Sequence, residues 1–317
     1  MAGEMERVDA ALRSSVANSD PHVTELATHL ISAGGKRLRP ALAIVCAAAG
    51  GGGLPVIDDV VLGGVAVELI QVGSLYHDDV IDDAQLRRGV PTANAAFGNR
   101  QAILGGDYLL AKASEIAASI GVEVAGLLAS TIAAMCEGQV QELTTAFRAE
   151  RTEEAYLASL AGKTASVFAS ACRVGAIVAD LPVAQREALT AYGRSYGMTF
   201  QLVDDVLDVV ATEEELGKPA GNDISEGVYT LPVLRTLSGG GDGATELAAV
   251  LGPDMETPEV ERALKLVRAG SGVEQTLELA RRYATDAGAA LGALPASPFT
   301  EALAAAALGL LDTVPDF

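Results

Sequence analysis

The sequence predicts an all-α protein with a single domain over residues 1–317. Three observations support this fold class. Apolar residues recur at the three-to-four spacing of helices through long Ala-rich segments, and no segment shows the sustained apolar–polar alternation of a half-buried strand. Several helical segments are also apolar on most faces. We therefore expect an internal layer of helices that is surrounded by other helices.

The expected helices are separated by breaks that are rich in Gly and Pro. The most regular helical segments span 56–79, 123–145 and 186–210. Breaks are expected at Gly34-Gly35, 50–55, 87–92, Leu181-Pro182, 217–223 and 238–243. The sequence shows no internal repeat of solenoid length, which favours one domain over an array of repeats.

The composition argues against several classes of function. The formal net charge is −20 and basic residues gather only in short clusters, so we expect no nucleic-acid partner. The first residues, MAGEMERVDA, lack a signal-peptide pattern, and the apolar runs near 41–49 and 302–311 are shorter than the roughly 20 residues of a membrane span. We expect a soluble, cytoplasmic protein without a membrane span, in which the three cysteines are buried thiols: Cys46, Cys136 and Cys172.

Charge is concentrated in the segment LYHDDVIDDAQLRRG at 75–89, within an otherwise apolar region. On a helix, Asp78 and Asp82 would lie about 5–6 Å apart with Asp79 beside them, and like charges at that spacing repel. A single DDxxD pattern can be a solvated acidic face. The same spacing recurs at 204–208, again at the end of a long apolar helix, and this repetition indicates a function.

Carboxylates held close together in apolar surroundings require cations, and oxygen ligands suit Mg²⁺, which also shares phosphate oxygens with substrates. Two facing triads would form a site that accepts a diphosphate when Mg²⁺ is bound. The expected metal ligands are Asp78, Asp79, Asp82, Asp204, Asp205 and Asp208.

Short basic clusters support a diphosphate ligand. Lys36, Arg37 and Arg39 follow a Gly-Gly turn, while Arg87 and Arg88 follow the first triad directly. Arginine forks match phosphate geometry and lysine supplies a point charge. Lys218 and Asp223 lie in the Gly-rich segment 217–232, which can equally be an ordinary turn between helices.

These residues resemble a known family, the trans-isoprenyl diphosphate synthases, or polyprenyl synthetases. Its landmarks occur in order: GGKRLRP at 34–40, DDVID at 78–82, RRGVPT at 87–92, GNRQAILGGDYLL at 98–110, GKT at 162–164, FQLVDDVLD at 200–208 and GKPAGNDISEGVYTLP at 217–232. The resemblance implies a single-domain bundle of antiparallel helices around a central cavity, an isoprenoid synthase-like fold.

The resemblance also implies roles for matching positions. The catalytic group would be Asp78, Asp79, Asp82, Lys163, Asp204, Asp205 and Lys218, with three Mg²⁺ ions per site when substrate is bound. The allylic diphosphate would be bound by Arg87, Lys163, Thr164, Gln201 and Lys218. Isopentenyl diphosphate would be bound by Lys36, Arg39, Gln71 and Arg88. Gln71 departs from the family, which usually has His there, and a glutamine donates a hydrogen bond but carries no charge.

Four nearby side chains invite a mechanistic role, and we assign them simpler ones. His77 is expected to act as a hydrogen-bonding residue beside the metal ligands. Tyr76, Phe97 and Phe200 are expected to pack in the core, although one of them could stabilise a cation weakly.

The reaction that the resemblance implies is a Mg²⁺-dependent head-to-tail (1'-4) condensation of isopentenyl diphosphate with an allylic diphosphate. Breaking the allylic C–O bond leaves a carbocation and a diphosphate, whose negative charge must be stabilised. No protein nucleophile is required. The alkene of isopentenyl diphosphate would attack the cation, a proton would leave, and an apolar cavity would exclude water.

Chain length and assembly follow from the same resemblance. In the family a bulky residue five positions before the first aspartate stops elongation, and here that position is Gly73. Along the same helix face follow Ile70 or Leu69 and then Ala66, so we expect a long product suited to a quinone side chain. We also expect a homodimer and a peripheral membrane contact for product release.

Other functions remain open. A short-chain synthase making farnesyl or geranylgeranyl diphosphate is the main rival. A terpene cyclase would generally lack GGKRLRP, and a non-catalytic, lipid-binding partner subunit would be expected to lose one aspartate triad, whereas this sequence has all three motifs. A dinuclear phosphohydrolase usually needs more histidines than the three present here.

Overall fold

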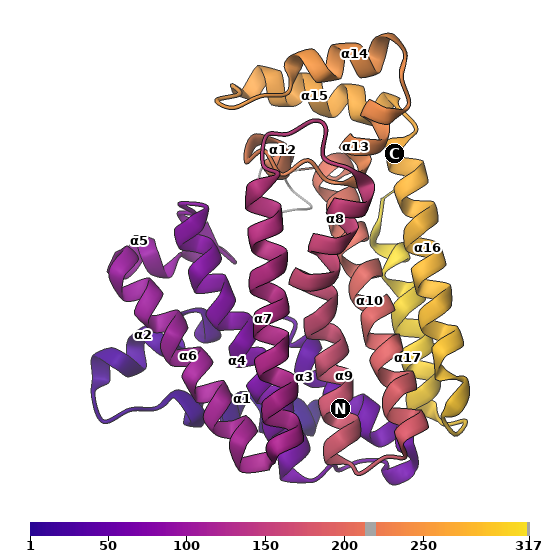
Figure 1. The fold of residues 1–317 in the computed structure, drawn as a ribbon. Coiled ribbons are helices and arrows are strands. Elements are labelled where there is room, and N and C mark those ends of the chain that lie inside the picture. Colours follow the sequence, from indigo (N-terminus) through magenta and orange to yellow (C-terminus); the bar gives the residue numbers. More distant parts are fainter. Residues whose placement is uncertain (213–219, 316–317) are drawn as a thin grey trace. The chain divides into compact units, whose positions relative to one another are not determined.

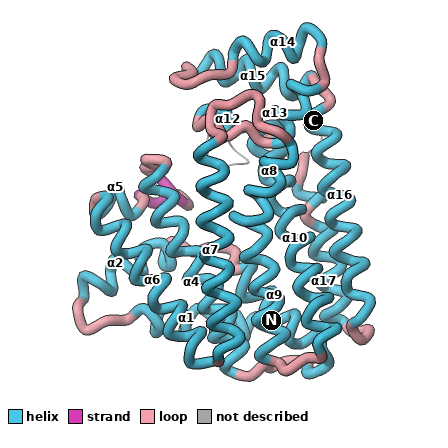
Figure 2. The backbone as a smooth tube through the Cα atoms, in the orientation of Figure 1, coloured by secondary structure: helices cyan, strands magenta, loops and turns pink. Residues whose placement is uncertain are grey.

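The computed structural model describes residues 1–212 and 220–315, and it is helical almost throughout (Figure 1). Among these residues, the only strands are β1 (Leu86–Arg87) and β2 (Val90–Pro91), a short antiparallel hairpin shown in magenta in Figure 2. The sequence-based prediction of an all-α fold is therefore confirmed.

Backbone contacts group the chain into two compact units, which are described separately. Unit 1 comprises Met1–Ile132, Val167–Gly193 and Leu291–Leu303, and unit 2 comprises Ala133–Ser166, Arg194–Ala290 and Ala304–Phe317. The single domain over 1–317 stays a prediction.

Unit 1 is built around one long apolar helix, α4 (Asp58–Ile81), which packs against α3 (Leu38–Ala47) and α6 (Asn99–Ile120). The remaining helices of unit 1 are α1 (Ala2–Val16), α2 (Pro21–Ser32), α5 (Ala93–Phe97), most of α9 (Ser166–Val178) and the first parts of α7 (Val122–Thr144), α10 (Val183–Val210) and α17 (Pro298–Gly309). Short turns of other helix types occur at Ala48–Gly52 and Leu291–Ala293.

Helix α4 corrects one expectation from the sequence. It is long and apolar enough, by length and composition, to cross a membrane, whereas the sequence analysis found no apolar segment of that length. Most of its apolar stretch is buried inside unit 1, as expected for the core helix of a globular unit. The difference arises because the apolar stretch of α4 is interrupted by residues such as Glu68 and Gln71, so it is not a continuous apolar run.

A buried ion pair joins the N-terminal helices of unit 1 to α4. Arg37, the residue that precedes α3, has a left-handed backbone and is only 7% exposed. Its Nη1 lies 3.1 Å from Oε1 of Glu68, which is 3% exposed, while Nη2 donates to the carbonyl of Ile31 at 2.7 Å and Nε to Asp9 Oδ1 at 3.3 Å. Arg37 therefore contributes to the core of unit 1 rather than to an exposed phosphate-binding cluster.

Unit 2 has its own apolar core, which includes Leu202 and Val206 of α10 and Leu231 of α13. Its further helices are the rest of α7, α10 and α17 together with α8 (Glu153–Leu160), α12 (Asn222–Ser225), α13 (Leu231–Ser238), α14 (Gly241–Val250), α15 (Thr257–Ala269) and α16 (Gly272–Ala290). Irregular helical turns occur at Ala161–Ala165 and Leu311–Thr313.

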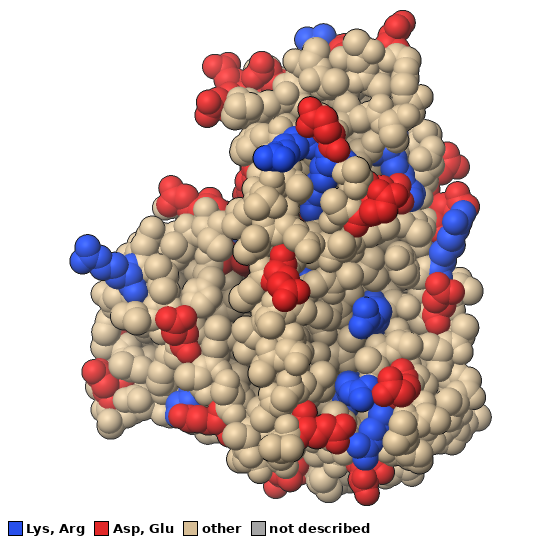
Figure 3. Space-filling model, viewed as in Figure 1, with Lys and Arg blue, Asp and Glu red and all other residues tan. Residues whose placement is uncertain are grey.

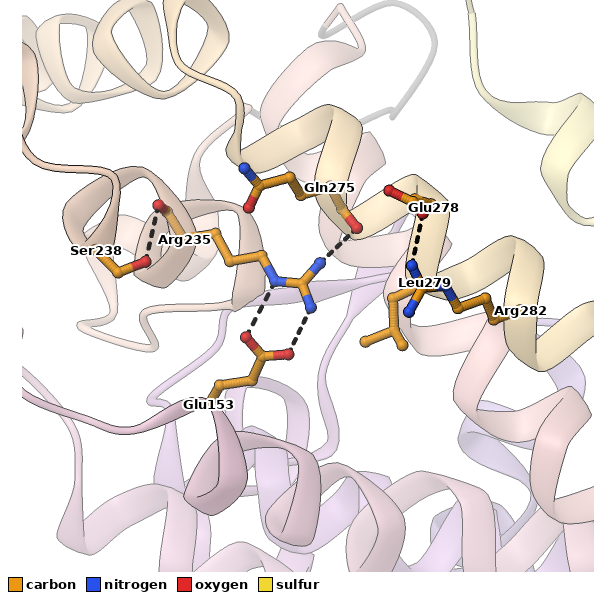
Figure 4. Close-up of a pocket in the computed structure, with 7 residues that line it drawn as sticks. All are labelled: Glu153, Arg235, Ser238, Gln275, Glu278, Leu279 and Arg282. Carbon is orange, nitrogen blue, oxygen red and sulfur yellow. Dashed lines mark hydrogen bonds and ion pairs between the residues drawn. The ribbon is translucent and has the colours of Figure 1, made fainter.

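A polar hollow of about 290 Å³ lies where α8, α13 and α16 meet in unit 2 (Figure 4). Arg235 of α13 donates two hydrogen bonds to Glu153 of α8, at 3.1 and 2.5 Å, and a third to the carbonyl of Gln275 on α16. Glu278 accepts from Arg282 across one helical turn at 2.6 Å. The charged groups of this hollow are thus paired with one another, and they connect three helices.

The cysteines correct a second expectation. Cys46 and Cys172 are buried, as expected, but Cys136 is exposed on α7. The Ala-rich sequence around Cys136 gives the same apolar pattern as a buried helix face, so the sequence did not reveal that this position faces outwards.

Glu68→Ala should destabilise the protein strongly, because it removes the buried carboxylate that pairs with the Arg37 guanidinium and leaves only the exposed Asp9 as a partner. We expect a loss of about 3–5 kcal/mol in the free energy of unfolding, measured by denaturant titration. The control is Glu246→Ala, which removes an exposed ion pair with Arg262 and should cost about 1 kcal/mol or less. Equal losses in the two variants would contradict a structural role for the buried pair.

Candidate active site

The first aspartate motif lies at the C-terminal end of α4, in unit 1. Asp79 is fully buried, Asp78 is partly buried and Asp82, which follows the last residue of the helix, is exposed. Nε of Arg87 donates to Asp79 Oδ1 at 2.5 Å. Burial raises the pKa of the Asp79 carboxyl above its usual value, and the positive charge of Arg87 opposes that shift.

The β1–β2 hairpin brings two basic motifs together in unit 1. Arg87 lies on β1, and Arg88 follows it with a left-handed backbone, so that its guanidinium donates to the carbonyls of Leu30, at 3.4 Å, and Gly34. The RRG sequence is therefore held against the Gly-Gly turn that begins GGKRLRP. The Arg88 side chain thus joins the RRG segment to the backbone of the GGKRLRP segment. Binding of an anion by these residues stays a prediction.

The other predicted ligands of isopentenyl diphosphate lie in the same unit. Lys36 is exposed, and the guanidinium of Arg39 lies 4.5 Å from the ring centroid of Phe168, a cation–π contact that orients it. Gln71 is partly buried and lies seven residues before Asp78, which places both on one face of α4 two turns apart.

The two side chains directly before the first aspartate motif, Tyr76 and His77, make mostly structural contacts. Nε2 of His77 lies 3.2 Å from the carbonyl of Ile103 and 3.3 Å from Asp107 Oδ1, both on α6. The buried hydroxyl of Tyr76 donates to the carbonyl of Leu26 at 2.6 Å, which confirms a packing role. The hydrogen bond of His77 links α4 to α6, in agreement with the role assigned to it.

The predicted chain-length residues are all buried in α4: Gly73, Ile70, Leu69 and Ala66. A Cβ atom added to Gly73 would lie 3.1 Å from the carbonyl oxygen of Gly106 and 3.3 Å from Cγ of Leu110. Gly73 therefore permits a close approach of α4 and α6. Its role in product length stays a prediction.

The second aspartate motif lies at the C-terminal end of α10, in unit 2. Asp204 is exposed, while Asp205 is 2% and Asp208 4% exposed. Burial raises the pKa of Asp205 to about 7, although hydrogen bonds from Tyr156 and Gln201 oppose the shift. Asp208 Oδ2 accepts a hydrogen bond from the backbone N–H of Asp223 at 3.2 Å, which ties the motif to α12.

Three predicted ligands of the allylic diphosphate surround this motif. Thr164 donates from Oγ1 to Gln201 Oε1 at 3.0 Å, and Gln201 Nε2 donates to Asp205 Oδ1 at 3.1 Å. Lys163 Nζ lies 2.7 Å from Glu142 Oε1. Of the other two predicted ligands, Arg87 lies beside Asp79 in unit 1, and Lys218 lies outside the described residues.

The GKT turn at 162–164 is packed tightly against α7 within unit 2. A Cβ atom added to Gly138 of α7 would lie 2.6 Å from the backbone nitrogen of Lys163 and 2.7 Å from the carbonyl oxygen of Ser159. No side chain larger than hydrogen fits there without moving the backbone. Gly138 thus fixes the position from which the Lys163 side chain begins.

Sequence analysis did not identify three residues near the second motif: Glu142, Arg151 and Tyr156. Glu142 is the ion-pair partner of Lys163, and the hydroxyl of Tyr156 donates to Asp205 Oδ2. Arg151 lies 5.3 Å from the ring centroid of Tyr156. None of the three stands in a repeated or clustered pattern, so their importance is visible only from the fold.

The motifs offer suitable ligands for a divalent metal ion. Among the described residues, no group of three or more His, Cys, Asp or Glu side chains forms a complete metal cluster. Mg²⁺ takes several of its ligands from water and substrate phosphate, so one or two carboxylates from each motif suffice. Asp79 Oδ2 is buried and has no hydrogen-bond partner in the described part of the chain, a state that a cation or metal-bound water would relieve. The residues present therefore fit the metal.

Comparisons with known proteins identify the family of the chain. A family model described as polyprenyl synthetase matches residues 20–267. A nonaprenyl diphosphate synthase of Mycobacterium tuberculosis is 38% identical over 300 residues, 94% of this chain and 89% of that protein. Component 2 of the heptaprenyl diphosphate synthase of Geobacillus stearothermophilus is 38% identical over 297 residues, 93% of this chain and 91% of that protein. A short chain isoprenyl diphosphate synthase of Methanothermobacter thermautotrophicus is 37% identical over 308 residues, 94% of this chain and 93% of that protein.

Among solved structures, the chain is similar to a polyprenyl synthase of Caulobacter crescentus complexed with calcium and isoprenyl diphosphate. The TM-score is 0.92 and the identity 35%, over 98% of this chain and 94% of that chain. The family and this metal-bound relative imply that the enzyme depends on a divalent metal. The predicted family, all-α fold and prenyltransferase activity in isoprenoid synthesis are confirmed. The chain belongs to the polyprenyl synthetase family.

Proposed function

We propose that the chain is an all-trans polyprenyl diphosphate synthase that extends an allylic diphosphate with isopentenyl diphosphate by 1'-4 condensation. The observation that carries this proposal is the presence of two complete DDxxD motifs, each at the end of a long apolar helix. Arg87 lies beside the first motif, and Gln201 and Thr164 lie beside the second. Relatives named as nonaprenyl and heptaprenyl synthases support a long product. We propose one longer than twenty carbons.

Exposure divides the six motif carboxylates into two groups with different tasks. Asp78, Asp82 and Asp204 are partly or fully exposed, so we assign them to direct contact with Mg²⁺. The buried carboxylates Asp79, Asp205 and Asp208 accept hydrogen bonds from the protein, and Oδ2 of Asp79 would in addition face the cation or a metal-bound water. Three Mg²⁺ ions per site remain part of the proposal. When bound, Mg²⁺ would stabilise the negative charge that develops on the departing diphosphate.

The remaining side chains bind and orient the two substrates. Lys163, Thr164 and Gln201 would bind the allylic diphosphate, together with Arg87 and Lys218. The group that binds isopentenyl diphosphate would consist of Lys36, Arg39, Arg88 and Gln71. Glu142 keeps the Lys163 ammonium paired until a diphosphate replaces it. Apolar helix faces exclude water, which would otherwise capture the allylic cation.

A short-chain synthase is the second candidate. The close contact between Gly73 and α6 favours it, because a glycine selected for packing need not line a product tunnel. The short-chain relative from Methanothermobacter thermautotrophicus also supports this alternative. The two candidates differ in the length of the product and not in the reaction.

Assembly and location are part of the same proposal. We propose a cytoplasmic homodimer with a peripheral membrane contact during product release, because the family consists of soluble enzymes. Unit 1 exposes two large apolar side chains on one turn of α6, Ile103 and Leu104, which a second copy could bury. On the face shown in Figure 3, basic side chains lie singly or beside acidic ones.

Incubation with Mg²⁺, farnesyl diphosphate and labelled isopentenyl diphosphate should give labelled products longer than twenty carbons, identified by chromatography and mass spectrometry. Hydrolysis, cyclisation or inertness would contradict the proposed reaction. Products of twenty carbons or fewer would establish the short-chain alternative.

An active Gly73→Tyr variant should make shorter products than the wild type, because the ring would block a tunnel along α4. The product length is measured by the same chromatography and mass spectrometry. An unchanged product length would exclude Gly73 from the tunnel wall.

Asp78→Asn and Asp204→Asn should each lower turnover by about 10²-fold or more, because each removes a charge that stabilises the leaving group through the metal. Steady-state kinetics at saturating Mg²⁺ measure the effect. Asp83→Asn is the matched control: it is exposed, adjacent to the first motif and outside the DDxxD spacing. Normal turnover in either motif variant, or an equal loss in the control, would contradict the assignment.

Leu104→Asp should convert a dimer into a monomer, because it places a charge in the proposed apolar interface. Light scattering at micromolar concentration measures the mass of each form. Val183→Asp, which changes another exposed apolar side chain of unit 1, serves as the control and should stay dimeric. A monomeric wild type would rule out the proposed dimer.

A further inference from the structure

A chain of buried hydrogen bonds extends behind the second aspartate motif, entirely within unit 2. Tyr156 of α8 is 4% exposed, and its hydroxyl donates to Asp205 Oδ2. The other oxygen of Asp205 accepts from Gln201 Nε2 at 3.1 Å. The carboxylate is therefore held from both sides by protein donors, and we call this arrangement the Tyr156–Asp205 chain.

Arg151 holds Tyr156, the residue at which the Tyr156–Asp205 chain begins. Its Nη2 donates to Ser159 Oγ at 2.5 Å, and Ser159 Oγ donates in turn to the carbonyl of Tyr156 at 2.8 Å. The Arg151 guanidinium lies 5.3 Å from the Tyr156 ring centroid. Arg151 is 7% and Ser159 2% exposed, so these contacts form inside the protein, where solvent does not compete for them.

The order of donors and acceptors determines how Gln201 is oriented. Its amide nitrogen donates to Asp205, and its amide oxygen accepts from Thr164 at 3.0 Å. A glutamine with both ends engaged in this way cannot turn its amide without breaking both hydrogen bonds. Gln201 and Thr164 are two of the proposed diphosphate ligands, so the orientation of these ligands depends on Asp205.

We propose that Tyr156, supported by Arg151, is a positioning residue that fixes Asp205 and, through it, the Gln201–Thr164 pair for binding of the metal-bound allylic diphosphate. Neither Tyr156 nor Arg151 need touch the substrate. This inference rests on the proposed function, since it assigns a diphosphate to the group formed by Lys163, Thr164 and Gln201.

A tyrosine that only packs has a different pattern of contacts. Tyr192, in unit 1, is fully buried, and its hydroxyl donates to the backbone carbonyl of Leu303 at 2.8 Å. The Tyr156 hydroxyl instead donates to a carboxylate of the motif DDVLD at 204–208, whose spacing is repeated at 78–82. Loss of either hydroxyl should weaken the fold, but only loss of the Tyr156 hydroxyl should alter ligand binding.

The test compares Tyr156→Phe with Tyr192→Phe in the full-length protein. The probe is a farnesyl thiolodiphosphate that does not ionise, and its affinity is measured by calorimetry at several Mg²⁺ concentrations. Thermal unfolding in the absence of metal measures the structural effect of each change. We expect both variants to unfold at somewhat lower temperatures, whereas only Tyr156→Phe weakens Mg²⁺-dependent binding of the probe, by about 10-fold.

Kinetics provide a second readout. Tyr156→Phe should raise KM for the allylic diphosphate and leave KM for isopentenyl diphosphate unchanged. The reason is that the Tyr156–Asp205 chain contacts only predicted ligands of the allylic diphosphate. Probe affinity and allylic KM equal to those of Tyr192→Phe would overturn the inference. If Tyr156→Phe does not fold, Arg151→Lys replaces it as the test, because lysine keeps the charge but lacks the planar group that stacks on Tyr156. Arg151→Lys should also lower the Mg²⁺-dependent affinity for the probe. Wild-type affinity in that variant would overturn the inference.

The same measurements separate this inference from the proposed function. A wild type that neither binds the probe with Mg²⁺ nor elongates farnesyl diphosphate would overturn the proposed function, and the inference with it. A wild type that does both, with a Tyr156→Phe variant that behaves like the control, would overturn the positioning role alone.

Discussion

The burial of carboxylates away from solvent is the constraint on which both aspartate motifs depend. Taking a carboxylate out of water is unfavourable unless a cation or hydrogen-bond donors replace the lost hydration. At Asp79 the replacement is Arg87, and at Asp205 it is Tyr156 and Gln201. Gln201 lies on the same helix as Asp205, but Arg87 and Tyr156 come from other elements, β1 and α8, so burial of these carboxylates also determines which segments must come together.

The same constraint explains why the site is built at helix ends. The apolar bodies of α4 and α10 supply the core of their units, and their last turns carry the charged residues. A charged turn at the end of a buried helix can expose one carboxylate to a ligand while its neighbour faces the protein, as Asp204 and Asp205 do. Stability and ligand binding are thus assigned to different residues of one short motif.

The sequence predicted the helical fold and the motif positions because both depend on local spacing. Helical periodicity and the repeated DDxxD pattern can be read without knowing which segments touch. Other features depend on contacts between distant segments, so no local pattern predicted them. They are the burial of Asp205, the pairing of Lys163 with Glu142 and the exposure of Cys136. The length of α4 was close to the predicted segment 56–79, but its apolar character over a membrane-spanning length was missed, because polar residues inside the buried helix interrupt its apolar run.

The tight packing of Gly138 against the GKT turn has a consequence for the kinetics of substrate binding. Because the backbone at Lys163 is closely packed against α7, this part of the site does not open and close as a loop. In its proposed role, the ammonium of Lys163 would reach a diphosphate by rotation about its own side-chain bonds. For partly exposed side chains such rotations occur in picoseconds to nanoseconds, whereas loop closures in enzymes take microseconds to milliseconds. In that role, the rotation of Lys163 is therefore too fast to limit the rate of an elongation cycle.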